Sequence, residues 1–259
     1  MTQTERRLFL IRELLREQPQ YSHIKIPAEE QAQRNLLRSL MNVRTPRPVG
    51  SEFLAVQDAY LQQETAEKGI TNLTDLTPVT RRIYLWKGDI TTLRCGAIVN
   101  AANSGMTGCY VPCHGCIDNA IHTYAGVQLR LACFDLMQRQ GHCEKTGQAK
   151  LTPAFNLPCQ YILHTVGPII EGAVTGTDRR LLAACYRACL ALAEEYHIPS
   201  VAFCCISTGE FHFPNRMAAE IALNTVLEFQ KQTQNSIEVI FNVFKDIDYK
   251  IYRELLRAD

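Results

Sequence analysis

The feature that most constrains this chain is a stretch rich in cysteine and histidine, residues 108–122, which reads GCYVPCHGCIDNAIH. Within it, Cys109, His114 and Cys116 place two thiols and one imidazole on a loop short enough to surround a single ion. Two sulfur ligands and one nitrogen ligand suit zinc. Three protein ligands leave a fourth position open for water or substrate, as in catalytic zinc sites, so the spacing predicts a catalytic metal site.

Two alternatives compete with this prediction. Cys113 lies in the same loop, and a site that used Cys109, Cys113, His114 and Cys116 together would be closed and structural. Simultaneous ligation by Cys113 and His114 is awkward, however, because the two residues are adjacent in the sequence. The other alternative is that the cysteines are ordinary buried thiols, because the chain has 11 of them and free cysteine is often buried.

The composition excludes several classes of protein. Hydrophobic residues make up 46% of the 259 residues, which is enough for a sizeable core. A formal net charge of +1 argues against an unspecific nucleic-acid binder, and no apolar run reaches membrane length. The N-terminus MTQTERRLFLIRELLREQ lacks the cleavage site of a signal peptide. We therefore expect a soluble, cytoplasmic protein that binds neither nucleic acid nor membrane.

The cysteines indicate the redox compartment. Their number is odd, and those outside the loop follow no framework spacing, which favours a reducing compartment without disulfides. Cys204 and Cys205 lie in an apolar run, and Cys185 and Cys189 are spaced as neighbours on one face of a helix. We predict that these four are core thiols.

Residues 1–75 are predicted to form an N-terminal helical extension. We expect Pro27 to be the first residue of its second helix and Gly69 to end its third. The extension carries no chemistry that its sequence reveals, and the two roles that we consider are packing over the sheet and recognition of a partner protein. Apolar residues recur at helical spacing at Leu8, Ile11 and Leu15, at Leu36, Leu37, Leu40 and Met41, and at Phe53, Leu54 and Leu61.

Residues 76–259 have a different pattern, in which short apolar runs alternate with helical stretches. The predicted strands are residues 83–86, 97–100, 161–166, 200–206 and 237–244, with an extended stretch at 148–154. The predicted helices are residues 117–138, 178–196, 214–230 and 247–257. This alternation predicts an α/β domain with a largely parallel sheet that helices cover on both faces.

Several of these strands end in small and polar residues. Ligands of open α/β sheets bind at the carboxyl ends of the strands, where Asp89, Asn103 and the cysteine loop are predicted to lie. Residues 207–211 follow a later strand and precede a helix. Such a loop offers backbone N–H groups to an anion, so it is interpreted as a phosphate cradle, with an ordinary turn as the alternative.

Five motifs follow one another along the second part of the chain: WKGDIT at 86–91, AIVNAAN at 97–103, IDNAIH at 117–122, LHTVGP at 163–168 and ISTG at 206–209. Together they resemble the motifs of macrodomains in order and spacing. The match covers roughly residues 80–259, and the loop GCYVPCHGC replaces the glycine-rich segment that most macrodomains have at this place. In this loop and in its helical extension, the chain is similar to the zinc-dependent macrodomains of bacterial and fungal pathogens. The resemblance implies a three-layer α/β/α fold with a mixed, largely parallel central sheet.

The resemblance also implies where ADP-ribose binds. Asp89, which the residues alone would make a turn residue, would accept a hydrogen bond from the adenine amino group, and Ile90 would supply a backbone donor beside it. Asn103 would contact the distal ribose. Phe244 would lie against adenine, with core packing as the alternative. The loop that would wrap the diphosphate consists of Ser207, Thr208, Gly209, Glu210 and Phe211.

For the cysteine loop, the resemblance implies a zinc ion held by Cys109, His114 and Cys116, with Cys113 outside the site. Asp118 matches the catalytic aspartate of hydrolytic macrodomains, which orients or deprotonates the attacking water. The alternative for Asp118 is a carboxylate that caps the free N–H groups at a helix start.

We therefore expect a zinc-dependent hydrolase that removes mono-ADP-ribose from an ester-linked carboxylate side chain, with Asp118 and Asn103 at the catalytic site. Asn119 and His122 are expected to orient the loop and the helix. Two other functions remain open: a reader that binds ADP-ribose without hydrolysing it, and an Asp118-dependent hydrolase whose zinc is purely structural. The resemblance implies an ADP-ribosylated protein substrate, such as a lipoylated carrier similar to the glycine-cleavage H protein, and a functional link to a sirtuin-type ADP-ribosyltransferase.

Overall fold

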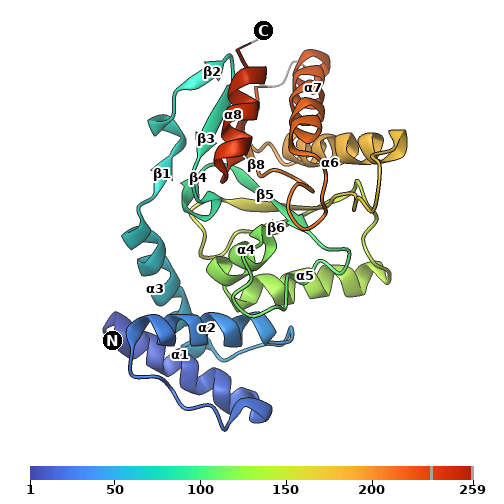
Figure 1. Ribbon diagram of the computed structural model, residues 1–259. Helices are drawn as coiled ribbons and strands as arrows, with labels where there is room; N and C mark the ends of the chain where they lie inside the picture. The colour runs from blue at the N-terminus through green and yellow to red at the C-terminus, as the bar shows by residue number, and fades with distance from the viewer. Residues whose placement is uncertain (234–235, 258–259) are drawn as a thin grey trace.

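The computed structural model describes residues 1–233 and 236–257, and it places the N-terminal helices beside an α/β domain (Figure 1). The extension contains α1 (Gln3–Glu17), α2 (Glu30–Val43) and α3 (Ser51–Lys68). Thr2 and Glu5 form a capping box, in which each side chain accepts a hydrogen bond from the backbone N–H of the other residue. The apolar faces bury Leu10, Leu37 and Leu61 in one cluster, which Val127 of the α/β domain also joins; this confirms the N-terminal helices.

Within the described residues, the central sheet has seven strands in the order β2, β3, β9, β8, β5, β7 and β6. The five inner strands run parallel, and β2 and β6 pair antiparallel at the two edges, so the predicted mixed, largely parallel sheet is confirmed. A separate parallel pair joins β1 (Thr71–Asn72) to β4 (Leu93–Arg94). The bounds of the central strands are β2 (Pro78–Thr80), β3 (Ile83–Lys87), β5 (Ala97–Ala102), β6 (Ala149–Pro153), β7 (Tyr161–Val166), β8 (Ser200–Phe203) and β9 (Glu238–Val243).

Helices cover both faces of this sheet, which confirms the three-layer architecture (Figure 1). One layer contains α4 (Ile117–Ala125) and α5 (Val127–Gln140). The other contains α6 (Gly176–Glu195), α7 (Asn215–Thr233) and α8 (Asp246–Leu255). Every residue of β8 and all but one residue of β5 are buried. Burial on both faces explains why these strands are continuous apolar runs without alternation.

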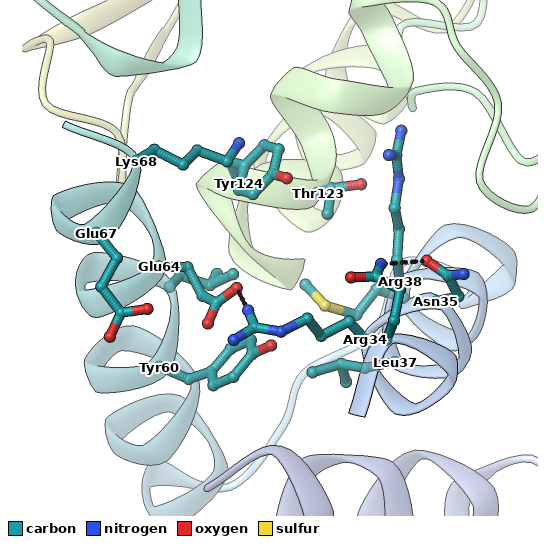
Figure 2. A pocket seen from close by; sticks show the side chains of 13 residues that line it. Arg34, Asn35, Leu37, Arg38, Tyr60, Glu64, Glu67, Lys68, Thr123 and Tyr124 are labelled. Carbon is teal, nitrogen blue, oxygen red and sulfur yellow. Dashed lines mark hydrogen bonds and ion pairs between the residues drawn. The ribbon is translucent and has the colours of Figure 1, made fainter. Parts of the chain in front are cut away.

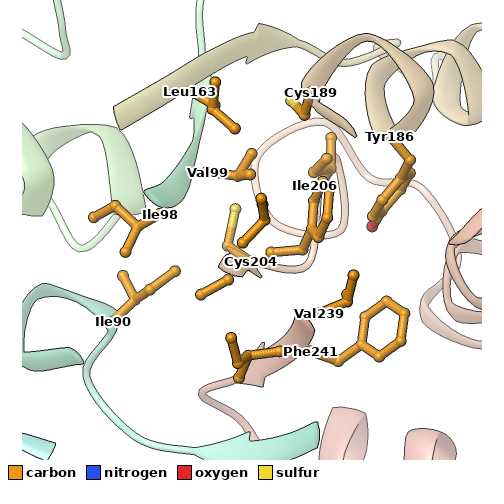
Figure 3. Close-up of a cluster of buried hydrophobic side chains, with 14 of the residues drawn as sticks. Ile90, Ile98, Val99, Leu163, Tyr186, Cys189, Cys204, Ile206, Val239 and Phe241 are labelled. Atoms are coloured by element: carbon orange, nitrogen blue, oxygen red, sulfur yellow. The ribbon is translucent and has the colours of Figure 1, made fainter. Parts of the chain in front are cut away.

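The main core lies between the sheet and its covering helices (Figure 3). Tyr186 from α6 packs against Phe203 from β8, with ring centroids 4.9 Å apart. Fully burying a large apolar side chain stabilises the fold by about 1.5–3 kcal/mol. The predicted core thiols Cys185, Cys189 and Cys204 are buried, whereas Cys205 is only half-buried. All 11 cysteines are free thiols.

The predicted helix at residues 117–138 is wrong in one respect, because Gly126 divides it into α4 and α5. Gly126 has φ +97°, in the left-handed region that favours glycine. The Gln57 side chain of α3 accepts a hydrogen bond from Val127 N–H at 3.0 Å, and the Asn156 amide donates to the Ala125 carbonyl at 3.0 Å. Contacts with residues distant in the sequence therefore fix the break, and helical periodicity does not reveal them.

The predicted start of the second helix at Pro27 is also wrong. α2 begins at Glu30, because the Glu29 carboxylate accepts hydrogen bonds from the first N–H groups of the helix, those of Gln31 and Ala32. Strands β1, β2 and β4 and three short 3-10 helices (Pro19–Tyr21, Leu73–Asp75 and Ile90–Thr92) escape prediction, because two or three residues carry too little periodicity. Across the described ranges, no helix has the length and apolar character needed to cross a membrane.

Candidate active site

The predicted site segments come together at one edge of the sheet. Strands β3, β9, β8 and β5 are consecutive neighbours and run parallel, so their carboxyl ends meet at the same edge. Asp89 follows β3, Phe244 follows β9, residues 207–211 follow β8, and Asn103 follows β5. Asn103 is exposed at this edge, where a ligand can reach it.

Asp118 is buried beneath this edge, in the first turn of α4. Its carboxylate accepts hydrogen bonds from the side-chain amides of Asn100 at 2.8 Å and Asn103 at 3.3 Å. Burial raises the pKa of Asp118 to about 6, while the bond from Asn100, the nearby Arg130 charge and the bond from Asn103 act to lower it. The carboxylate is thus held by amide donors in a largely dry environment.

The alternative role of Asp118 as a helix cap is wrong. Cys116 occupies the N-cap position of α4, and its Sγ accepts from Asn119 N–H at 3.4 Å. His122 Nε2 lies 3.6 Å from the Asp118 carboxylate. This pair is not an ion pair, because burial holds the pKa of His122 well below its usual range and keeps the imidazole neutral.

The three predicted metal ligands are close together. Cys109 Sγ and His114 Nδ1 are 3.6 Å apart, and the two sulfur atoms and one ring nitrogen of His114 all lie within 4.8 Å of one another. In a tetrahedral zinc site, the bond to sulfur is about 2.3 Å long and the bond to nitrogen about 2.0 Å. A sulfur and a nitrogen ligand of the same ion therefore lie about 3.5 Å apart. Burial raises the pKa of the Cys116 thiol to about 12, so without a cation nearby Cys116 is a neutral thiol. The donor set and its spacing therefore fit zinc.

Cys113 points away from these three ligands. Its Sγ lies 3.4 Å from the Asn35 carbonyl and 3.3 Å from Ser39 Oγ, both on α2. Its backbone has φ +52°, which turns the chain between Cys109 and His114. The structure thus separates Cys113 from the other candidate ligands, as the resemblance implies.

The predicted phosphate loop forms a tight turn at the end of β8. Its Ser207 has φ +64°, and the Phe213 N–H closes the turn by donating to the Ser207 carbonyl at 2.9 Å. Within residues 1–233 and 236–257, the Ser207 hydroxyl has no hydrogen-bond partner, although it is buried. The backbone N–H groups of Gly209 and Glu210 likewise find no acceptor there. This loop can therefore offer several donors to an anion.

Neighbouring segments hold the phosphate loop in place. Ile170 N–H donates to the Phe211 carbonyl at 2.9 Å. A Cβ at Gly167 would lie only 2.0 Å from Ser207 Oγ, so the close approach of the two segments requires glycine there. Glu210 Oε1 lies 3.7 Å from His114 Nε2. The phosphate loop and the cysteine loop therefore meet at this side chain.

Asp89 and Phe244 lie at the other end of the edge. Asp89 accepts from Thr91 N–H at 3.0 Å and from its hydroxyl at 2.6 Å, and its second oxygen contacts Lys68 Nζ at 3.1 Å. Burial acts to raise the pKa of Asp89, but Thr91 and Lys68 together hold it below its usual range. Ile90 is only 2% exposed and begins the short 3-10 helix Ile90–Thr92, whose Asp89 cap precedes it. Phe244 is 76% exposed, so the core-packing alternative is wrong.

A cavity of about 390 Å³ lies between the extension and α4 (Figure 2). Its lining includes Arg34 and Arg38 from α2, Lys68 from α3 and Tyr124 from α4. The Lys68 ammonium lies 3.4 Å from the centroid of the Tyr124 ring and also contacts Asp89. The extension therefore reaches the adenine end of the predicted site.

Three residues near the site have no role in the sequence predictions. Asn100 is fully buried in β5, where it donates to Asp118 and lies 3.1 Å from His164 Nδ1. A polar amide inside an apolar strand is unusual, so the sequence alone could have marked Asn100 as a candidate site residue. Lys68 and Arg130 approach from distant parts of the chain, and no local pattern marks them.

Comparisons with known proteins agree with the geometry of this site. The Macro domain family model matches residues 99–222. A protein from Treponema medium named protein-ADP-ribose hydrolase is 58% identical over 260 residues, which cover 99% of this chain and 100% of that protein. A protein of the same name from Staphylococcus aureus (strain Mu50) is 47% identical over 253 residues, 97% of this chain and 95% of the relative. The crystal structure of a Trypanosoma brucei macrodomain in complex with ADP-ribose superposes with a TM-score of 0.67 and 28% identity, over 85% of this chain and 94% of that one. The chain therefore belongs to the macrodomain family.

Proposed function

We propose that this protein is a zinc-dependent hydrolase that removes mono-ADP-ribose from modified proteins. The observation that carries the proposal is the convergence of Cys109, His114 and Cys116 within 4.8 Å, on the loop that leads directly into the buried Asp118. The two relatives named protein-ADP-ribose hydrolase support the reaction. The Trypanosoma brucei macrodomain in complex with ADP-ribose supports the ligand.

The order of the strands supports the way in which the ligand would lie. Across the edge, β3, β9, β8 and β5 present Asp89, Phe244, the 207–211 loop and Asn103 in that sequence. ADP-ribose has the same linear order of adenine, diphosphate and distal ribose. We therefore place adenine against Asp89, the Ile90 backbone and Phe244, the diphosphate on the 207–211 loop, and the distal ribose at Asn103.

The anomeric carbon of that ribose would be bonded to an oxygen of a modified aspartate or glutamate side chain. Hydrolysis breaks this carbon–oxygen bond, adds the hydroxyl of water to the carbon and gives the remaining proton to the released side chain or to solvent. Positive charge develops on the ribose as the bond breaks. Asp118, which accepts hydrogen bonds from Asn100 and Asn103, would orient or deprotonate the water and face that charge.

Zinc would be held by Cys109 Sγ, His114 Nδ1 and Cys116 Sγ. When bound, the ion supplies a Lewis acid that orients a ribose hydroxyl and water and lowers the pKa of that water. Glu210, 3.7 Å from His114 Nε2, is placed to orient the imidazole. Because two thiolates neutralise the charge of the ion, we expect positioning to matter as much as acidity.

The family resemblance suggests the protein that carries the ADP-ribose. We propose a lipoylated carrier similar to the glycine-cleavage H protein, modified on a carboxylate side chain by a sirtuin-type ADP-ribosyltransferase. Incubation of the modified carrier with this protein should release free ADP-ribose, whereas the unmodified carrier should yield none.

Alanine substitutions at Asp118 and Cys109 test the hydrolase directly. Release of ADP-ribose from a protein modified on glutamate should fall by roughly 100- to 10,000-fold in Asp118→Ala, while ADP-ribose affinity, measured by calorimetry, changes little. Cys109→Ala should lose release through loss of the metal. Asp135→Ala and Cys143→Ala are matched controls at exposed positions outside the site.

Three outcomes separate the functions. Full release by both Asp118→Ala and Cys109→Ala would contradict the proposal. If the wild-type protein bound ADP-ribose tightly but released none from the modified substrate, the protein would be a reader. If Cys109→Ala lost the metal and melted at a lower temperature but kept its release activity per folded molecule, the zinc would be structural.

A further inference from the structure

Helix α2 of the N-terminal extension contacts the cysteine loop through Arg38. The guanidinium donates to Asn119 Oδ1 from Nε at 3.1 Å and from Nη2 at 2.7 Å, and Nη2 also donates to the His114 carbonyl at 2.8 Å. Asn119 in turn donates from its side-chain amide to the Val111 carbonyl at 2.9 Å. One arginine of the extension thus holds the loop backbone at His114 directly and at Val111 through one side chain.

A second residue of α2, Asn42, holds the middle of the loop. Its Oδ1 accepts from Cys113 N–H at 2.9 Å, and its Nδ2 donates to Thr123 Oγ1 of α4 at 3.0 Å. Asn42 is only 1% exposed, so water competes little for these bonds. Asn42 therefore fixes the loop and the helix that follows it to the same point of α2.

Arg130 of α5 connects the end of α2 to the start of the loop. Its Nη1 donates to the carbonyls of Asn42 at 2.5 Å and Arg44 at 2.8 Å, and its Nη2 donates to the Cys109 carbonyl at 3.3 Å. The guanidinium also lies 4.0 Å from the centroid of the Tyr110 ring. The loop is therefore held at Cys109, Val111, Cys113 and His114, and each tether leads to α2.

The hydrogen bonds of Arg38 go to the cysteine loop and to the first turn of α4, which follows it. Within the described residues, its hydrogen-bond partners are neutral oxygens of the loop and of α4, and it has no carboxylate partner. Arg34, one turn earlier on α2, instead pairs with Glu30 and Glu64 inside the extension. In Figure 2 the Arg38 side chain points away from the Arg34–Glu64 pair.

We propose that α2 completes the metal site, with Arg38 and Asn42 as positioning residues that hold the cysteine loop in its ligating conformation before the ion binds. The link to the metal rests on the proposed zinc-dependent function. A loop that is already ordered loses less conformational entropy when it binds an ion, so its affinity for the ion is higher. The N-terminal extension thereby acquires a role in the reaction.

Hydrogen exchange of the metal-free full-length protein tests the positioning. In Arg38→Ala, the amides of residues 109–116 should exchange about tenfold faster or more, while the amides of β5 and β8 exchange as in the unmodified protein. Arg38→Lys, which keeps the charge and stem but loses the bidentate contact, should give an intermediate rate. Arg34→Ala is the matched control and should leave the loop unchanged. Wild-type exchange of the loop in Arg38→Ala would overturn the proposal.

Competition with a chromogenic chelator then measures the affinity for zinc. Arg38→Ala should bind zinc about 10- to 100-fold more weakly than the unmodified protein, and Arg34→Ala should bind it equally well. Equal affinity in Arg38→Ala would overturn the proposed effect on the metal. If the unmodified protein bound no zinc but Arg38→Ala still loosened the loop, the positioning would stand and the zinc-dependent function would fail.

Discussion

Substitution of Gly108 by alanine tests whether the start of the cysteine loop is as tightly packed as the structure indicates. Gly108 has φ +84°, and a Cβ there would lie 2.7–2.9 Å from three atoms of the His122 ring. His122 is 4% exposed, so its ring has little room to move. The left-handed backbone costs about 1–2 kcal/mol for alanine, and overpacking costs about 1–3 kcal/mol. Gly108→Ala should therefore lower the free energy of unfolding by about 2–5 kcal/mol.

Urea unfolding of the metal-free protein measures this loss, and Gly115→Ala is the control within the same loop. Beyond the two adjacent residues, no atom lies within 4 Å of a Cβ at Gly115, so this variant should unfold within about 0.5 kcal/mol of the wild-type protein. Gly108→Ala should also weaken zinc binding, because it displaces the loop that begins there. Unfolding free energies within about 0.5 kcal/mol of each other for the two variants would refute the packing argument.

Three other substitutions test separate parts of the molecule. Phe244→Ala should weaken ADP-ribose binding by roughly 5- to 150-fold in calorimetry without changing stability, because Phe244 is 76% exposed; unchanged affinity would mean that adenine lies elsewhere. Burial lowers the pKa of His164 to about 3, so the unfolded chain gains a proton below about pH 6.5 that the folded chain does not. The free energy of unfolding should therefore fall by about 1.4 kcal/mol per pH unit from about pH 6.5 toward pH 3, and His164→Gln should remove that part of the slope in urea titrations; an identical slope would contradict it. Gly167→Ala places a Cβ 2.0 Å from Ser207 Oγ and should weaken ADP-ribose binding about tenfold or more in calorimetry, whereas wild-type affinity would mean that the phosphate loop adapts.

Much of the fold and the site follows from local sequence patterns. Apolar runs mark β5 and β8 because these strands are buried on both faces. Asp89, Asn103 and residues 207–211 each follow a strand of the parallel core, so the topology alone brings them to one edge. The ligand set Cys109, His114 and Cys116 lies within eight consecutive residues, and its closeness in space follows from that spacing.

Long-range contacts account for what the sequence does not reveal. Arg38 and Asn42 lie on an ordinary amphipathic helix, and only the fold shows that they face the cysteine loop. The break at Gly126 is likewise fixed by Gln57, which comes from a different helix. Periodicity records which face of a helix is apolar, but not which distant segment a polar side chain meets.

Metal analysis of the purified protein, combined with a release assay, tests the zinc-dependent hydrolase most directly. The protein should contain one zinc ion per chain, release ADP-ribose from a glutamate-modified protein, lose this activity on chelation and regain it when zinc is added back. The Cys109→Ala variant should contain no zinc at the same protein concentration. Undiminished release after complete removal of the metal would contradict the role proposed for Cys109, His114 and Cys116.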